Sequence, residues 1–173
     1  MMSLDFPKEF SNEQQQVEEE IRKNRSGQLA PLFNMLLHSP EVARGWAALG
    51  TAIRFRTSLS DDVRELLIYF TALRTDCPVE VTWHHPMALE AGVPQEVLDD
   101  LGDWRASQRI SDQYRTVLAV GECALQGKEF SSASPNDDAM SATTVVEIYA
   151  LVVYYAAVAQ FLNGTGLAET FEA

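Results

Sequence analysis

The sequence predicts an all-α protein, a single-domain bundle of about six or seven helices. Apolar residues recur at three- and four-residue steps through most of the chain, as in residues 29–37 and 63–73. Alternating apolar and polar runs, which indicate half-buried strands, are scarce, and Ala, Leu and Glu dominate. A chain of 173 residues is long enough for one substantial core, so one domain is expected.

The N-terminal segment predicts a polar arm followed by the first buried helix. Residues 11–25 are rich in Glu and Gln, which is typical of an exposed helix or a partly ordered arm, and we assign residues 1–28 to it. Residues 28–38 then carry leucines and Phe33 at helical spacing, which predicts a buried face. Residues 29–173 are therefore expected to form the helical domain.

Two helices with clear start signals follow. Ser39 and Pro40 precede a helix that continues through Ile53, because proline is tolerated at the first helical position. Ser60 begins the next helix, whose apolar residues define a buried face. Glu65 lies away from the centre of that face, so we expect it to reach the edge of a pocket.

The helix expected from Pro78 to Gly92 carries the most chemically active side chains. Cys77 lies at its N-terminal cap, where the helix dipole favours thiolate over thiol. Glu80 and His84 are four residues apart and share one face, and Cys77 lies close to two turns before His84. The three titratable groups are expected to lie along one stripe of the helix.

The C-terminal half predicts three more helices. A short helix over residues 94–101 and a longer one over residues 111–127 precede a Ser-, Gly- and Pro-rich loop at residues 127–136. The last helix covers about residues 140–163, and its residues 148–159 include no charge or amide. This apolar segment is shorter than a bilayer span of about 18 to 20 residues, so we expect it in the core, between subunits, or both.

Charge and composition exclude several classes of function. With 25 acidic and 13 basic side chains the net charge is −12, which disfavours nucleic acids and anionic membranes. The N-terminus has no basic segment followed by an apolar run, so we expect a soluble cytoplasmic protein. His84 and His85 are adjacent rather than four apart, and there is no phosphate loop or dinucleotide fingerprint, so we expect no metal and no cofactor.

The spacing of four residues resembles the carboxymuconolactone decarboxylase family, which includes the alkyl hydroperoxidase D-like proteins. In the hydroperoxidase branch a glutamate precedes a Cys-x-x-Cys pair by twelve residues, and a histidine follows the second cysteine by four. Here Glu65 lies twelve residues before Cys77, Glu80 occupies the second-cysteine position, and His84 follows four residues later. The specific part of the resemblance is therefore this set of four residues.

Glu80 decides which branch the resemblance favours. In the hydroperoxidase branch the second cysteine resolves the sulfenic acid formed on the first, and a carboxylate has no sulfur to do so, which excludes local disulfide cycling. The decarboxylase branch resembles this chain in having glutamate there. The resemblance then implies a lyase acting on a small carboxylated lactone or organic acid, in an all-helical homo-oligomer, often a trimer or hexamer.

Within that hypothesis each of the four residues has a role. His84 is the general acid/base, Glu65 and Glu80 orient and tune it, and Cys77 lines the pocket or assists. Each residue also has an ordinary structural role, such as a small buried side chain for Cys77. Four arginines near these residues are expected either to supply positive charge for an anionic substrate or to form ordinary surface ion pairs: Arg54, Arg56, Arg64 and Arg74. Three tyrosines of the last helix are expected either to place a hydroxyl group near the pocket or to pack in the core: Tyr149, Tyr154 and Tyr155.

Two other functions stay open at this stage. One is thiol peroxidase chemistry at Cys77, with an external thiol or Cys123 resolving the oxidised sulfur. The other is a non-catalytic oligomeric binding protein that keeps the pocket without the reaction. The sequence does not identify the substrate, because the residues that select it come from several helices.

Overall fold

The computed structural model describes residues 5–25, 27, 29–132 and 140–167. These residues form eight α-helices and two short 3₁₀ helices, and no strand is found among them. The all-α prediction is confirmed, with one or two more helices than expected. The helices expected at residues 28–38 and 94–101 are present but short, with six helical residues each.

The N-terminal part of the described chain consists of three helices: α1 (Asn12–Lys23), α2 (Pro31–Leu36) and α3 (Pro40–Phe55). Ser11 begins α1 through a capping box with Gln14, in which each residue's side chain accepts a hydrogen bond from the other's backbone N–H. Val17 and Ile21 of α1 are buried, and α1 packs against α3. The segment expected as an exposed helix or loose arm is therefore an amphipathic helix docked on its neighbour.

The rest of the described chain contains five α-helices and two 3₁₀ helices: α4 (Asp61–Arg74), α5 (Pro78–Glu90), α6 (Gln95–Asp100), η1 (Leu101–Asp103), α7 (Asp112–Leu125), η2 (Phe130–Ser132) and α8 (Ala142–Gly164). The predicted start of α5 is confirmed, with Cys77 as its N-cap and Pro78 at its first position. The predicted end is also close, because Gly92 takes a φ of 97° just after the helix.

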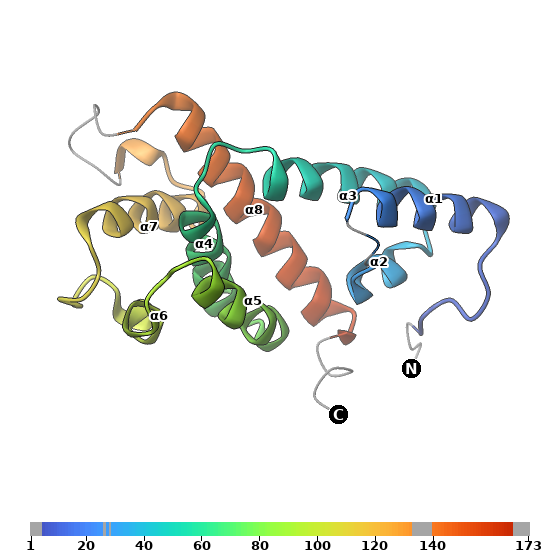
Figure 1. Ribbon diagram of the computed structural model, residues 1–173, viewed down its shortest axis with the longest axis horizontal. Helices are drawn as coiled ribbons and strands as arrows, with labels where there is room; N and C mark the ends of the chain where they lie inside the picture. The colour runs from blue at the N-terminus through green and yellow to red at the C-terminus, as the bar shows by residue number, and fades with distance from the viewer. Residues whose placement is uncertain (1–4, 26, 28, 133–139, 168–173) are drawn as a thin grey trace.

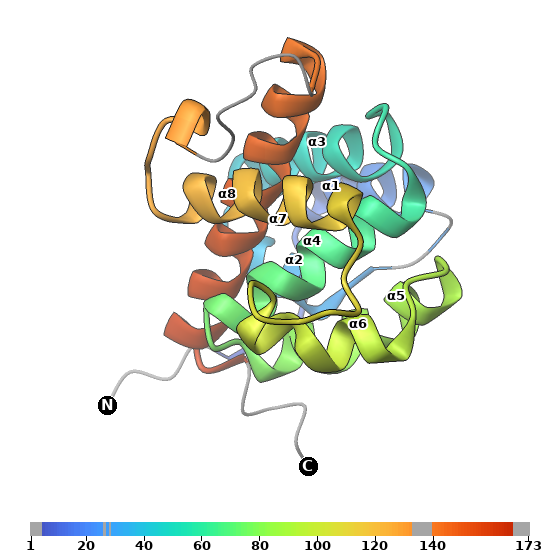
Figure 2. The same ribbon diagram turned by 90° about the vertical axis from the view of Figure 1, so that its left-hand side faces the viewer.

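Helix α4 lies at the centre of the bundle, where it packs against α5, α7 and α8. Figure 1 shows α8 running diagonally between the α4–α7 side and the α1–α3 side, and Figure 2 shows α4 enclosed by its neighbours. Four successive residues of α4 are fully buried or nearly so, which explains its central place: Leu67, Ile68, Tyr69 and Phe70. Helices α1 to α3 reach this body mainly through the contact of α3 with α8.

Helix α8 is buried on one side only. Leu151 and Val152 are completely buried, whereas Val146 and Val153 are 66% and 54% exposed. By length and composition, α8 is apolar enough to cross a membrane. Of its apolar stretch, 44% is buried inside the molecule. Core helices of soluble proteins share this length and composition with membrane-spanning helices.

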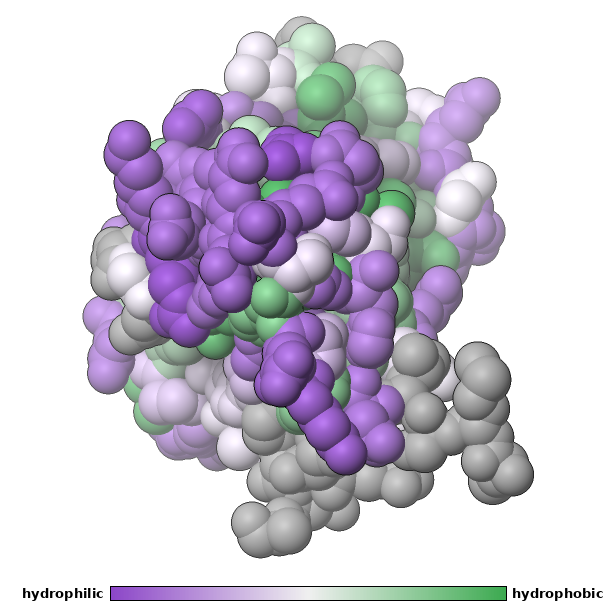
Figure 3. All heavy atoms as spheres, turned by 90° about the vertical axis from the view of Figure 1, so that its right-hand side faces the viewer, coloured by the Kyte–Doolittle hydropathy of each residue, from purple (hydrophilic) through white to green (hydrophobic). Residues whose placement is uncertain are grey.

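The surface at the α1–α3 end is mainly hydrophilic, with smaller apolar areas between the polar side chains (Figure 3). This agrees with the excess of acidic over basic residues in the chain. The apolar residues of α1 and α2 instead face α3 and the interior, where Leu32, Phe33, Met35 and Leu36 are buried.

Candidate functional site

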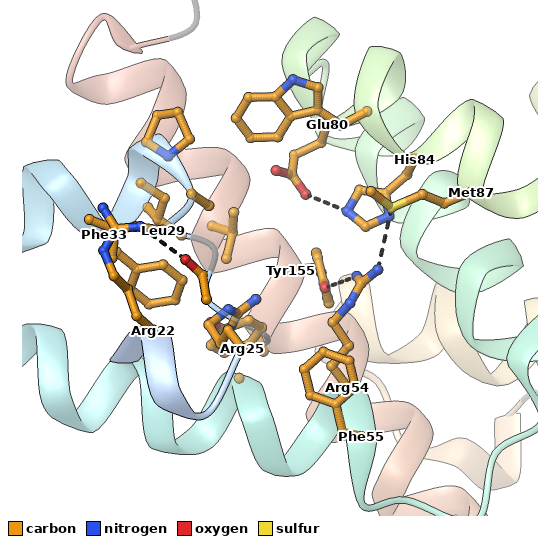
Figure 4. Close-up of a pocket in the computed structure, with 18 residues that line it drawn as sticks. Arg22, Arg25, Leu29, Phe33, Arg54, Phe55, Glu80, His84, Met87 and Tyr155 are labelled. Atoms are coloured by element: carbon orange, nitrogen blue, oxygen red, sulfur yellow. Dashed lines mark hydrogen bonds and ion pairs between the residues drawn. The ribbon is translucent and has the colours of Figure 1, made fainter. Parts of the chain in front are cut away.

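A cavity of about 750 Å³ lies between the α1–α3 side and helices α5 and α8. Figure 4 shows Leu29, Phe33 and Arg25 on one side, Glu80 and His84 on the other, and Arg54 and Tyr155 between them. Much of the lining is apolar, including Leu29, Leu32, Phe33, Phe55, Trp83 and Val158. Such a volume is typical of small-molecule sites, and a few polar groups converge on it.

Glu65 and His84 form the buried polar centre next to this cavity. Glu65 Oε2, on α4, accepts a hydrogen bond from His84 Nδ1, on α5, at 2.8 Å, and both residues are at most 5% exposed. The two meet because α4 and α5 pack side by side. Glu65 does not line the cavity itself, so the expected position at a pocket edge is corrected: it lies behind the imidazole and orients it.

Glu80 approaches the other ring nitrogen of the same histidine. Its Oε2 lies 3.4 Å from His84 Nε2, which is long for a hydrogen bond, and this buried oxygen has no hydrogen-bond partner among the described residues. Both Glu80 and His84 line the cavity, as Figure 4 shows. The imidazole therefore has a carboxylate at each nitrogen and an edge that a ligand can reach.

Arg54, on α3, completes the buried network. Its Nη2 lies 3.1 Å from Glu65 Oε1, and its Nη1 donates a hydrogen bond to the Tyr155 hydroxyl oxygen at 2.8 Å. Arg64 Nε lies farther from the same Glu65 oxygen, at 3.8 Å. The Tyr155 ring also meets the His84 ring edge-on, with centroids 5.4 Å apart. Three helices besides α5 thus fix the position of the imidazole.

The charges of this network shift the pKa of both central groups. Burial acts to raise the pKa of Glu65, but the hydrogen bond from His84 and the charge of Arg54 outweigh it and lower that pKa. Burial acts to lower the pKa of His84, but the two carboxylates, Glu65 first and then Glu80, raise it above its ordinary value. His84 therefore keeps its proton to a higher pH than a free histidine does.

Tyr155 is positioned as a neutral hydrogen-bond donor. Burial raises the pKa of its phenol, and the charge of Arg54 offsets only part of this effect. Because Arg54 donates to the phenol oxygen, the Tyr155 hydroxyl proton remains free, and no acceptor for it is found among the described residues. A ligand carbonyl or enolate oxygen in the cavity can take that place.

Cys77 does not join this cluster. The side chain is completely buried and does not line the cavity, so the predicted stripe contains only Glu80 and His84. Burial raises the pKa of the Cys77 thiol, and the backbone N–H groups of Glu80 and Val79 offset this only in part. The predicted thiolate character is therefore wrong, because desolvation outweighs the helix dipole. Cys123, on α7, is a second buried free thiol.

The flanking residues considered from the sequence separate in the structure. Of the four arginines, Arg54 lines the cavity, Arg64 pairs with Asp61 and lies 3.8 Å from Glu65, and Arg74 pairs with Glu122. Arg56 is exposed. Tyr154 and Tyr155 line the cavity, whereas Tyr149 donates its hydroxyl to the Lys128 backbone oxygen. His85 faces the Tyr69 ring and Gln95, outside the cavity.

Sequence reasoning missed the contribution of the α1–α2 segment. Arg22, Arg25 and Phe33 line the cavity from this side. The burial of Val17 and Ile21 follows from a helical pattern visible in the sequence, and this was the available signal that α1 docks rather than extends. No local pattern marks Arg25 as facing a cavity. Among the described residues, no cluster of three or more His, Cys, Asp or Glu suited to a metal is found.

Comparison with protein families matches residues 40–122 to the carboxymuconolactone decarboxylase family. The matched region runs from the start of α3 into α7, so it includes the whole Arg54–Glu65–His84–Glu80 network and Cys77. It excludes α1, α2 and α8, which supply the remaining walls of the cavity. A search of the curated proteins found no match.

Proposed function

We propose that this protein is a carboxy-lyase of the carboxymuconolactone decarboxylase type, because residues 40–122 match that family. Its substrate would be a small carboxylated lactone or related organic acid. The observation that carries the proposal is the buried hydrogen bond between Glu65 and His84 at the wall of a mostly apolar cavity. A buried histidine with a raised pKa, oriented by a carboxylate, is suited to deliver a proton.

In the proposed reaction the bond between the substrate carboxylate carbon and the adjacent ring carbon breaks. Carbon dioxide leaves, and the electron pair moves into the conjugated carbonyl to give an enolate. The protonated His84 then gives its proton to carbon, which neutralises the enolate and leaves a neutral imidazole that is reprotonated before the next turnover. Glu65 stays ionised throughout, because its role is to hold the ring and favour the imidazolium.

Two further side chains support this chemistry. Tyr155 lines the cavity, and Arg54 donates a hydrogen bond to its oxygen and holds it in place, so the Tyr155 hydroxyl can donate to the enolate oxygen. Glu80 has a buried oxygen without a partner beside His84 Nε2, where its negative charge favours the reprotonation of the imidazole by water after turnover. Both roles need residues that are fixed before the substrate arrives, as these are.

The experiment is to measure carbon dioxide release from a panel of small carboxylated lactones by wild type, His84→Gln and His85→Gln. His85 is a matched control, because it is the adjacent residue of α5 but faces Tyr69 outside the cavity. We expect His84→Gln to lose about a hundredfold or more of turnover and His85→Gln to keep it. Equal turnover in both variants, or no release by wild type from any lactone, would contradict the proposal.

The thiol peroxidase alternative has less support. Peroxide must reach a thiolate, and Cys77 is buried outside the cavity with a raised thiol pKa. A non-catalytic binding protein would share the same cavity, so the turnover experiment separates it from the lyase.

We also propose that copies of the chain assemble into a trimer or hexamer. Val146, Tyr149, Ala150 and Val153 lie on one face of α8, and Val146 and Val153 are exposed. Light scattering measures the mass directly, and Val153→Glu should lower it. A monomeric wild type would overturn this part.

Cytoplasmic residence is a further part of the proposal. It is supported by the packing of α8 against α4 and α7 and by the strongly negative net charge. Fractionation of cells tests it, and recovery of the protein in the membrane pellet would overturn it.

A further inference from the structure

Three arginines line the cavity, and they differ in their partners. Arg22 pairs with Glu18 at 2.8 Å, and Arg54 pairs with Glu65 at 3.1 Å. Arg25 has no carboxylate partner among the described residues, and its buried Nη1 has no hydrogen-bond partner there either. Arg25 is half-buried, and a half-buried guanidinium without a carboxylate partner costs the folded state free energy that an anionic ligand would recover.

The guanidinium of Arg25 is held in a definite position. Its central carbon lies 4.7 Å from the centroid of the Phe33 ring, within the range of a cation–π contact. Burial lowers the pKa of Arg25, and its charge interacts with Tyr154, Tyr155 and Arg54 on the neighbouring walls. The group remains charged, because an arginine keeps its proton throughout the physiological range.

We propose that Arg25 and Phe33 form an anion-binding subsite that takes a carboxylate of the ligand. The ring of Phe33 supports the guanidinium, and the unpartnered Nη1 of Arg25 together with a neighbouring guanidinium N–H can bind the two carboxylate oxygens side by side. The apolar body of the ligand then lies against Leu29, Phe55 and Trp83. This inference rests on the proposed function, since it concerns how the same cavity holds its substrate.

The carboxylate bound at Arg25 is an anchor that stays on the ligand. Figure 4 shows Arg25 on the α1–α2 side of the cavity and His84 on the α5 side, so the two act on different parts of one molecule. Pairing with a guanidinium would also stabilise the charge that decarboxylation has to disperse, which would slow the loss of a carboxylate at that position. The group that leaves therefore lies nearer to His84.

The position of the subsite in the chain gives it a separate role. Arg25 and Phe33 lie before residue 40, outside the region that matches the family. The acid/base network lies wholly inside it. Ligand selection by Arg25 is thus a property of the N-terminal segment of this chain, and changes there should alter which ligand binds without altering proton transfer.

The test compares two probes of nearly equal shape, 2-naphthoate and the neutral 2-naphthamide, by equilibrium binding to wild type, Arg25→Gln and Arg109→Gln. Arg109→Gln is the matched control, because it removes the same charge at an exposed site that pairs with Asp100. We expect wild type and Arg109→Gln to bind the carboxylate about tenfold more tightly than the amide. Arg25→Gln should lose this preference. An unchanged preference in Arg25→Gln, or none in wild type, would overturn the subsite.

Two further measurements distinguish a ligand subsite at Arg25 from a purely structural role of that residue. His84→Gln should keep the preference for 2-naphthoate, so the subsite is tested even if the proposed chemistry fails. Without ligand, Arg25→Gln should unfold at the same temperature as wild type or higher, because an unpaired charge has been removed. A lower unfolding temperature together with unchanged probe binding would make Arg25 a structural residue and reject the proposal.

Discussion

The two walls of the cavity differ in how their charges are balanced. On the α3–α5 wall, Glu65 lies between His84 and Arg54, and each charge has an opposite charge within 3.1 Å. On the α1–α2 wall, the guanidinium of Arg25 packs on the Phe33 ring, and no carboxylate among the described residues pairs with it. The charges of Glu65, His84 and Arg54 are balanced without a ligand, whereas an anionic ligand would balance the charge of Arg25. This difference suggests that proton transfer and ligand recognition reside in separate segments.

The largest effect should come from removing the charge of Glu65 on the α3–α5 wall. Glu65→Gln leaves the buried Arg54 without its carboxylate, so we expect the free energy of unfolding to fall by about 3 kcal/mol. Turnover should fall together with it, because the imidazole loses both its orientation and its proton. Denaturant unfolding measures the first effect. A matched control is Glu41→Gln on α3, because the Glu41 side chain is exposed. Equal destabilisation by both variants would show that the buried network contributes no more to stability than a surface ion pair does.

The close contact between α3 and α8 beside the cavity should also be sensitive. A Cβ atom on Gly50 of α3 would overlap the hydroxyl of Tyr154 on α8, so Gly50→Ala must displace that ring and the cavity beside it. We expect a loss of about 1 to 3 kcal/mol in unfolding free energy. Gly45→Ala, in the same helix with no atom within 4 Å of the added Cβ, should be neutral or stabilising. If both alanines behave alike, α8 does not approach α3 this closely.

The pH dependence of turnover tests the charges around His84 on the α3–α5 wall. His84 acts as an acid in the proposed reaction and its pKa is raised, so turnover should persist above pH 6.5 and fall only as pH rises through the raised value. Glu80→Gln removes one of the charges that raise this pKa, so the fall should move to lower pH. A fall that stays in place would show that Glu80 does not act on His84.

The smallest effect on turnover is expected at Cys77. Cys77→Ser places a hydroxyl at a completely buried position outside the cavity, so unfolding free energy should fall by about 1 to 2 kcal/mol while turnover changes little. Measuring both separates structure from chemistry. If a folded Cys77→Ser variant has no turnover, the Cys77 thiol takes part in the reaction, which contradicts this prediction.

The sequence predicted the helices and part of the site because both depend on local spacing. Glu80 and His84 share a face through their four-residue spacing, and the family resemblance added Glu65 from the preceding helix. The thiol of Cys77 was predicted wrongly, because its pKa depends on burial by tertiary packing rather than on its place at the cap. Arg25 could not be predicted, because the cavity it faces is formed by segments far apart in the sequence: the α1–α2 segment, α3, α5 and α8.

The most direct test of the central claim is an NMR titration of the His84 ring in wild type and in Glu65→Gln. The chain has three histidines, and His38 and His85 serve as internal references. We predict that His84 titrates above the ordinary value of about 6.5 in wild type and at a clearly lower pH in Glu65→Gln. A wild-type His84 that titrates at or below that value, unchanged by Glu65→Gln, would contradict the claim.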